Sequence, residues 1–203
     1  MAILLIADHD GRELAPSTAK ALTAARSIGG DIDILVAGEG CGSVAEAAAK
    51  LGGVRKVLLA EAPHLAHGLA EELAALITPL MDGYSALVAP ATTTTKNVMP
   101  RVAAQLDVPQ ISEIIAVDAP NRFARPIYAG NAIQVVEAPA DMKLVVTVRA
   151  PAFQAAADGG SAPIEKVEAP AALGLSQFES EDLSTSEDRK STRLNSSHRT
   201  GSR

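Results

Sequence analysis

The stretch AILLIADHDG (residues 2–11) decides the fold, because it reads as a strand that is buried on both faces. Six apolar residues, Ala2–Ala7, run without interruption and end at the polar turn DHDG. A half-buried strand would alternate apolar and polar residues, whereas a continuous run of this kind is typical of a parallel sheet with helices on both sides. The first residues therefore predict an α/β protein.

Segments of helix and strand character alternate after this first strand. The segment LAPSTAKALTAARSIGG (14–30) has apolar residues at helical spacing and ends at a glycine pair. Three further strand–helix pairs follow, namely DIDILVAG with SVAEAAAKLGG, RKVLLAEAP with HLAHGLAEELAALITPLM, and YSALVAPA with KNVMPRVAAQLD. Short connections between such pairs predict a three-layer α/β/α, open, mostly parallel, Rossmann-like sheet with right-handed crossovers.

The rhythm changes after Val108-Pro109. Three strand-like runs without helices between them cover 111–118, 123–139 and 142–153. Their turn signals predict antiparallel strands added at the C-terminal end of the sheet. A Pro/Gly/Ala-rich stretch from Ala155 then contains one short strand candidate, PIEKVEA. We expect an α/β domain over residues 1–169, a linker over 170–188 and a basic tail over 189–203.

Composition and charge narrow the function class. The chain of 203 residues has a net charge of −6, which argues against a nucleic-acid partner. The single cysteine, Cys41, excludes an internal disulfide framework and fits a reducing compartment. No window approaches the about 18 apolar residues of a membrane span, and the N-terminus lacks a signal peptide. We therefore expect a cytoplasmic protein without membrane insertion.

The C-terminal stretch differs from the rest of the chain. All 24 acidic residues lie at or before Asp188, so residues 1–188 carry −11, whereas residues 189–203 hold five basic residues and no acid. Loss of apolar periodicity predicts disorder from about Ser176. The segment STRLNSSH (191–198) resembles translated vector or adapter sequence, so we interpret residues 189–203 as a non-native or disordered tail rather than an interaction arm.

Two loops that follow predicted strands are candidates for nucleotide binding. The loop GEGCGS (Gly38–Ser43) has glycines where a phosphate-binding turn belongs, but Ser43 replaces the third glycine of the dinucleotide pattern, which argues against an NAD-dependent enzyme. The alternative is a flexible turn with Ser43 as helix N-cap, and Cys41 as an incidental thiol. The second loop is the threonine-rich stretch PATTTTKN (90–97), whose hydroxyls and lysine form a plausible anion cradle or simply cap a helix.

Polar residues after the first strand extend this candidate nucleotide site. Asp8–Asp10 ends that strand at the sheet edge where ligands bind in open α/β folds, although such turns also serve as caps. We take Asp8, Thr94, Lys96 and Asn97 as the candidate nucleotide-loop residues. His64 and His67 are three residues apart on a predicted helix, but no acidic or cysteine partner is evident, so we expect no metal site and no catalytic residue.

Several segments together resemble a known family. KNVMPRVAAQLDVPQISEI (96–114), RPIYAGNAIQVVE (125–137) and KLVVTVRAPAF (143–153) resemble the N-terminal domain of the electron transfer flavoprotein alpha subunit. The similarity runs from ILLIADHDG to about FESEDLS, which is most of the chain, and PRVAA, RPIYAGNA and TVR-x-x-x-F are its specific parts. One position departs from the pattern, because Thr95 stands where the family usually has glycine.

The resemblance implies an electron carrier rather than an enzyme. It implies a heterodimer with a beta subunit and one FAD, which accepts electrons from acyl-CoA and other dehydrogenases and passes them to the electron transfer flavoprotein–quinone oxidoreductase. In that family a second alpha-subunit domain holds most of the FAD, so we do not expect this chain alone to bind it. The location would be the cytoplasm in bacteria or the mitochondrial matrix in eukaryotes.

The strand-rich segment 111–153 is the candidate contact with a partner subunit. Arg122, Arg125, Tyr128 and Asn131 lie at its expected turns, and arginine and tyrosine often dominate interface energetics. The alternative is that these residues only cap and solvate the turns. A second hypothesis for the whole chain is a free-standing adenine-nucleotide-binding α/β module that uses Asp8–Asp10, Gly38–Ser43 and Thr92–Lys96.

Overall fold

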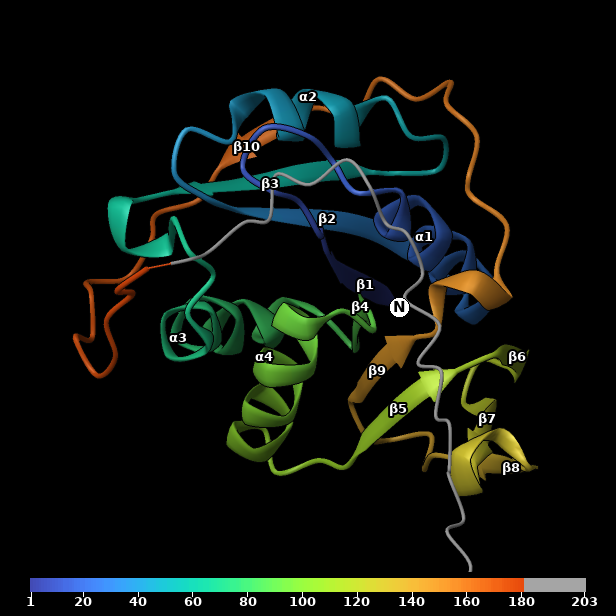
Figure 1. Ribbon diagram of the computed structural model, residues 1–203. Coiled ribbons are helices and arrows are strands. Elements are labelled where there is room, and N and C mark those ends of the chain that lie inside the picture. Colours follow the sequence, from blue (N-terminus) through green and yellow to red (C-terminus); the bar gives the residue numbers. More distant parts are fainter. Residues whose placement is uncertain (181–203) are drawn as a thin grey trace, which may run out of the picture.

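A central parallel sheet divides the molecule into two helical layers (Figure 1). The computed structural model describes residues 1–180. Strand β1 (Ala2–Ile6) lies in the middle of the sheet and pairs in parallel with strands on both sides. The uninterrupted apolar run therefore forms the buried strand that the sequence predicted.

The seven strands of this sheet have the order β10-β3-β2-β1-β4-β9-β5, and each neighbouring pair is parallel. The predicted fold class is confirmed. The strands other than β1 are β2 (Asp31–Gly38), β3 (Lys56–Glu61), β4 (Ala86–Pro90), β5 (Gln110–Ile114), β9 (Leu144–Val148) and β10 (Ile164–Lys166). The helices are α1 (Pro16–Ile28), α2 (Gly42–Ala49), α3 (Ala70–Leu80) and α4 (Thr93–Gln105), with short 3-10 turns at Pro63–Leu65, Met81–Gly83, Tyr128–Gly130 and Ala150–Ala152.

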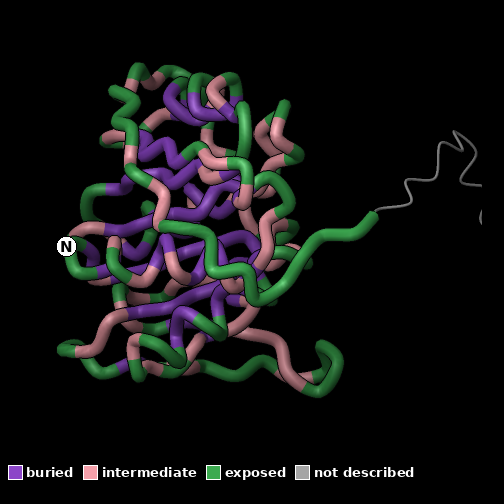
Figure 2. The backbone as a smooth tube through the Cα atoms, turned by 90° about the vertical axis from the view of Figure 1, so that its left-hand side faces the viewer, coloured by how far each residue is buried: buried purple, intermediate pink, exposed green. Residues whose placement is uncertain are grey.

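The alternation of side chains along β1 creates two separate cores. Ile3 and Leu5 pack with α1 and α2 on one face, whereas Leu4 and Ile6 pack with α3 and α4 on the other. Figure 2 shows the buried segments gathered in the middle of the molecule and the exposed ones around it. Both cores consist mainly of aliphatic side chains and alanine, as the low aromatic content requires.

The strand-rich segment has a different arrangement from the expected one. Strands β5 and β9 join the main sheet in parallel, and β9 lies between β4 and β5. The antiparallel strands form a separate sheet in the order β6-β7-β8, with β6 (Ala116–Ala119), β7 (Arg122–Ile127) and β8 (Ala132–Glu137). The physical reason is that all five residues of β9 are buried, so this strand needs a neighbour on each side.

The long helix expected from His64 is also shorter than the pattern suggested. A 3-10 turn over Pro63–Leu65 comes first, and α3 begins only at Ala70. Gly68 in between has a φ of 60°, a left-handed conformation that interrupts a right-handed helix. Among residues 1–180, no helix combines the length and the apolar character that a bilayer crossing requires.

The end of the described chain lies against the domain. Strand β10 pairs with β3, and residues 170–180 then lie beside α3. Ser176 donates a hydrogen bond to Glu71, and the Phe178 ring stacks on His67, so the expectation of disorder from about Ser176 is wrong for these residues. Residues 181–203, which include the expected tail and the end of the expected linker, lie outside the described residues.

A buried aspartate, held by an exposed arginine and a tyrosine, closes the amino-terminal edge of the sheet. Asp33 on β2 is fully buried, and its carboxylate accepts hydrogen bonds from Arg55 Nε at 2.8 Å and Nη2 at 2.6 Å. Tyr84, which precedes β4, donates its hydroxyl to the same carboxylate at 2.5 Å. Burial and the negative charge of Asp33 raise the pKa of Tyr84, so its hydroxyl stays protonated as a donor.

We expect Tyr84→Phe to lower the free energy of unfolding by about 1.5–3 kcal/mol, because the buried Asp33 carboxylate loses a charged hydrogen bond. Urea unfolding followed by circular dichroism measures the change. Tyr128→Phe is the matched control, since Tyr128 is 80% exposed, and it should leave the midpoint unchanged. Equal stabilities of the Tyr84→Phe and wild-type proteins would show that this contact does not hold the sheet edge.

Candidate functional site

Asp8 joins three elements at the carboxyl edge of the sheet. The strand order reverses between β1 and β4, and this is the position where ligands bind in open α/β sheets. Here Thr92, after β4, donates to Asp8 Oδ1 at 3.2 Å, and Ser17 of α1 donates to Oδ2 at 2.8 Å. Both carboxylate oxygens therefore accept hydrogen bonds from the chain itself, and the Thr92–Asp8 bond crosses the crevice.

His9 and Asp10 take part in the turn that follows. The Gly11 amide donates to His9 Nδ1 at 3.0 Å, and burial lowers the pKa of His9, which favours the neutral ring. Asp10 Oδ1 accepts hydrogen bonds from the amides of Arg12 and Glu13 at 2.8 and 2.7 Å. These contacts agree with the alternative interpretation of the Asp-rich turn as a capping structure.

In the glycine loop Gly38–Ser43, His9 and Cys41 take up the space above Gly38, whereas Gly40 and Gly42 face open space. Cys41 is fully buried in the core, and burial together with the nearby Glu61 raises the pKa of its thiol. Helix α2 begins at Gly42 with Cys41 as its N-cap, so the expected role of Ser43 as N-cap is wrong. Ser43 instead donates its hydroxyl to the carbonyl of Arg12 at 3.1 Å.

The threonine-rich loop is a helix cap. Thr92 is the N-cap of α4 and forms a capping box with Thr95, whose hydroxyl also donates to the carbonyl of Pro90. Thr95 lies in the first turn of the helix and is 3% exposed. The Thr95 hydroxyl thus ties α4 to the end of β4.

The four nucleotide-loop candidates do not converge on one place. Thr94 and Asn97 line a cavity of about 440 Å³ between the first turns of α3 and α4, together with His67 and Glu71. Lys96 lines a different cavity, and Asp8 bonds to Thr92 and Ser17. His64 and His67 do not share a helix face, and among residues 1–180 no group of three or more His, Cys, Asp or Glu could hold a metal ion.

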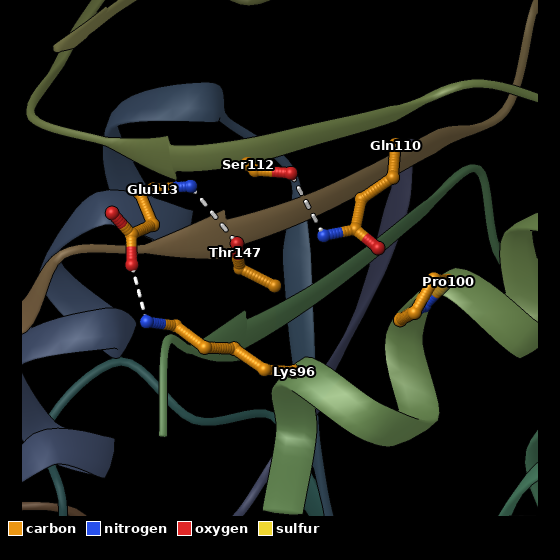
Figure 3. Close-up of a pocket in the computed structure, with 6 residues that line it drawn as sticks. All are labelled: Lys96, Pro100, Gln110, Ser112, Glu113 and Thr147. Atoms are coloured by element: carbon orange, nitrogen blue, oxygen red, sulfur yellow. Dashed lines mark hydrogen bonds and ion pairs between the residues drawn. The ribbon is translucent and has the colours of Figure 1, made fainter. Parts of the chain in front are cut away.

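The cavity beside Lys96 is lined mostly by polar residues that the sequence did not bring together (Figure 3). It has a volume of about 480 Å³ and lies between α4, β5 and β9. Gln110 donates to Ser112 Oγ at 3.0 Å, while its Oε1 atom is buried without a hydrogen-bond partner in the described part of the chain. Glu113 pairs with Lys96 across the opening.

Glu113 has a strained backbone. Its φ is 56°, it lies at the irregularity of β5 between Ile111 and Ile114, and its amide donates to Thr147 Oγ1 at 2.9 Å. The hydrogen bond from Lys96, followed by the charges of Lys96, Arg149 and Arg125, lowers the pKa of Glu113. No residue type or spacing in QISEI signals this left-handed position, because only the pairing of β5 with β9 imposes it.

The four candidate interface residues occupy different faces of the small sheet. Tyr128 is 80% exposed in the turn between β7 and β8, and Asn131 ends that turn. Arg122 is exposed at the start of β7. Arg125 is half-buried, and strand alternation places it on the face of Phe123, which packs into the core.

Two apolar side chains of β8 are exposed on the opposite, outer face. Ile133 and Val135 are 56% and 49% exposed, and they lie two residues apart on one face of the strand. Their partners in register are Pro126 and Ala124 of β7. We call Tyr128, Ile133 and Val135 the outer patch. In AIQVVE, Ile133 and Val135 occupy alternate positions, with Gln134 and Val136 at the others. This period of two could have indicated that Ile133 and Val135 share one face of the strand.

We expect Lys96→Met to raise the pKa of Glu113 toward its ordinary value, because the largest stabilising partner of the carboxylate is removed. The folded-state pKa of Glu113 lies below the unfolded-state value. The pair therefore stabilises the protein above the unfolded-state pKa, and this contribution is lost as the pH falls through the folded-state pKa. Side-chain carbon NMR titration of Glu113 measures the shift. The exposed Lys50→Met is the control, and an unchanged Glu113 titration in Lys96→Met would contradict the ion pair.

Comparison with known proteins agrees with the α/β fold described above and with the family resemblance seen in the sequence. The model of the electron transfer flavoprotein domain matches residues 3–172. The chain is 54% identical over 92% of its length to the electron transfer flavoprotein subunit alpha of Pseudomonas aeruginosa, and covers 60% of that protein. It is 58% identical over 92% of its length to the subunit alpha of Bradyrhizobium diazoefficiens, covering 59% of it.

A more distant relative is the probable mitochondrial electron transfer flavoprotein subunit alpha of Caenorhabditis elegans. It is 39% identical over 91% of this chain, which covers 56% of that protein. The chain thus spans somewhat less than two thirds of the length of these relatives. The family match includes the main sheet, its helices and the small antiparallel sheet. The chain therefore belongs to the electron transfer flavoprotein family.

Proposed function

We propose that this chain is the N-terminal scaffold and subunit-interface domain of an electron transfer flavoprotein alpha subunit. The observation that carries the proposal is the family match over residues 3–172, together with relatives that are named alpha subunits. The intact protein would carry electrons rather than catalyse a reaction with an acid or base. Its location would be the cytoplasm, or the mitochondrial matrix if the source is eukaryotic, as the names of bacterial and mitochondrial relatives suggest.

We infer the redox partners from the family resemblance. The intact protein would accept electrons from acyl-CoA and other dehydrogenases and donate them to the electron transfer flavoprotein–quinone oxidoreductase, as in fatty acid β-oxidation. The cofactor would be FAD, which supplies the one- and two-electron chemistry when bound. The protein would bind the flavin and adjust its potential in a heterodimer with a beta subunit.

The described residues do not fit an FAD. The crevice where the strand order reverses is crossed by the Thr92–Asp8 hydrogen bond, and the His9 ring and the Cys41 thiol take up the space above Gly38 of the glycine loop. The cavities on either side of the first turn of α4 have volumes of about 440 and 480 Å³ and do not share their lining. We therefore assign the main FAD contacts to the part of the relatives' length that this chain does not span. The same crossing contact disfavours the free-standing adenine-nucleotide module.

The outer patch is the surface that we assign to the beta subunit. Tyr128, Ile133 and Val135 are exposed and belong to one hairpin, whose second strand, β8, ends the small sheet. An exposed sheet edge with apolar side chains is a surface that proteins usually cover. Arg122 and Asn131 would lie at the rim, and Arg125, which lies near Glu113, would support the sheet from within.

We expect the purified chain to be colourless and to carry no stoichiometric FAD, because the Thr92–Asp8 hydrogen bond crosses its crevice. Absorbance at flavin wavelengths after gel filtration, and titration with FAD, AMP and ATP, measure this. A yellow protein whose flavin survives gel filtration would contradict the assignment of the cofactor site. Micromolar binding of an adenine nucleotide without a partner would favour the module hypothesis instead.

We expect Tyr128→Ala in the full-length alpha chain to cost about 1–3 kcal/mol of association with the beta subunit, because a large exposed aromatic contact is lost. Co-purification and titration calorimetry measure the loss, while the far-UV spectrum should stay the same. Arg26→Ala is a control on α1, since Arg26 is exposed outside the small sheet. Unchanged recovery of the beta subunit with Tyr128→Ala and with Arg125→Ala would rule out this surface as the main contact.

A further inference from the structure

The segment 170–178 crosses the N-terminal end of α3, where it contacts the helix at two points and the preceding loop at a third. We call this segment the strap. Its residues from 171 onward are exposed, and it follows β10, whose neighbours Val167 and Ala169 still pack against the core. In Figure 1 it is the orange-to-red segment beside α3. Neither the fold nor the proposed function requires this position, because the sheet and both helical layers are complete before residue 170.

The first contact is made by a buried carboxylate. Glu72, in the first turn of α3, is 3% exposed. Its Oε1 atom accepts hydrogen bonds from the amides of Leu173 at 2.9 Å and Gly174 at 3.2 Å, and Oε2 accepts from Leu173 at 3.1 Å. Gly174 has a φ of 64°, a left-handed conformation next to Leu173 that lets two successive amides point at one anion.

The other two contacts lie further along the strap. Ser176 donates to Glu71 Oε2 at 3.0 Å, and Glu71 is itself held by Arg101 of α4 at 2.8 Å. The ring of Phe178 stacks on His67, with 3.7 Å between the ring centroids and 8° between the planes. The strap thus binds a carboxylate, a second carboxylate and an aromatic ring in sequence, all from residues 67–72.

We propose that residues 67–72 form a docking site for the strap, with Glu72 as its docking residue, and that this clasp fixes where the chain leaves the domain. With the clasp closed, Phe178 is the last anchored residue of the described range 1–180. With the clasp open, the last anchored residue is Ala169, and nine further residues are free to extend by up to about 30 Å. The clasp therefore sets the reach of the residues that follow it.

The chemistry of Glu72 makes the clasp reversible. A buried carboxylate is tolerated because backbone amides satisfy it, and the N-terminal end of a helix favours its negative charge. When the strap leaves, water replaces the two amides as donors to the Glu72 carboxylate. Opening thus exchanges hydrogen bonds of similar kind and leaves no charge buried without a partner.

Hydrogen exchange of the full chain tests the docking role of Glu72. We expect the amides of Leu173 and Gly174 to exchange about tenfold faster or more in Glu72→Gln, because an amide side chain provides a single neutral acceptor and adds a donor. Glu46→Gln, an exposed position on α2, is the matched control and should leave the exchange unchanged. Wild-type protection of both amides in Glu72→Gln would overturn the proposal.

A second variant removes a hydrogen-bond donor from the strap instead of changing the acceptor on α3. Leu173→Pro deletes one amide of the strap and leaves α3 intact, so it decides the question if Glu72→Gln fails to fold. Spin labels at Lys50→Cys and Glu179→Cys, in a Cys41→Ala background, report the distance between the domain and the end of the strap. We expect a narrow distribution with wild-type Leu173 and a broader, longer one with Leu173→Pro. Identical distributions would show that the clasp does not hold the chain.

Discussion

The burial of strand β9 on both sides is the constraint on which the rest of the structure depends. All five of its residues are buried, and it lies between β4 and β5 although β5 precedes it in the chain. The chain must therefore leave the sheet after β5, travel outside it and return to insert β9. Strands β6–β8 form in that excursion, and Phe123 and Val136 attach their inner face to the core beside α1. The opposite face keeps Ile133 and Val135 exposed, so the surface that we assign to the partner follows from the order of the strands.

The carboxyl edge of the main sheet explains why this domain acts as a scaffold in our account. In many α/β proteins that edge offers free polar groups to a ligand. Here Asp8 bonds to Thr92 and Ser17, and Thr95 bonds to the end of β4. Lys96 is paired with Glu113. These polar residues thus connect strands to helices and stabilise the layers. Because their side chains are bonded within the domain, they are not free to bind a ligand at this edge of the sheet.

Local patterns predicted the central part of the fold because a strand that is buried on both faces has a continuous run of apolar residues. The runs at Ala2–Ile6 and Ala86–Pro90 and the helical spacing of α1 are of this kind. Features that depend on pairing with distant residues could not be predicted from a local pattern. The insertion of β9 and the left-handed backbone of Glu113 both depend on partners far along the chain. The buried state of Glu72 likewise depends on Leu173, about a hundred positions away, so a charged residue in a helical first turn gave no sign of it.

The central claim, that the hairpin formed by β7 and β8 is the surface covered by the partner subunit, is tested most directly by hydrogen exchange of the full-length alpha chain with and without its beta subunit. We expect the amides of residues 128–137 to become protected on association, while those of α2, which packs over β2 and β3 toward the opposite edge of the main sheet, do not change. Protection confined to α2 and its neighbouring loops, with unaltered exchange in β8, would contradict it.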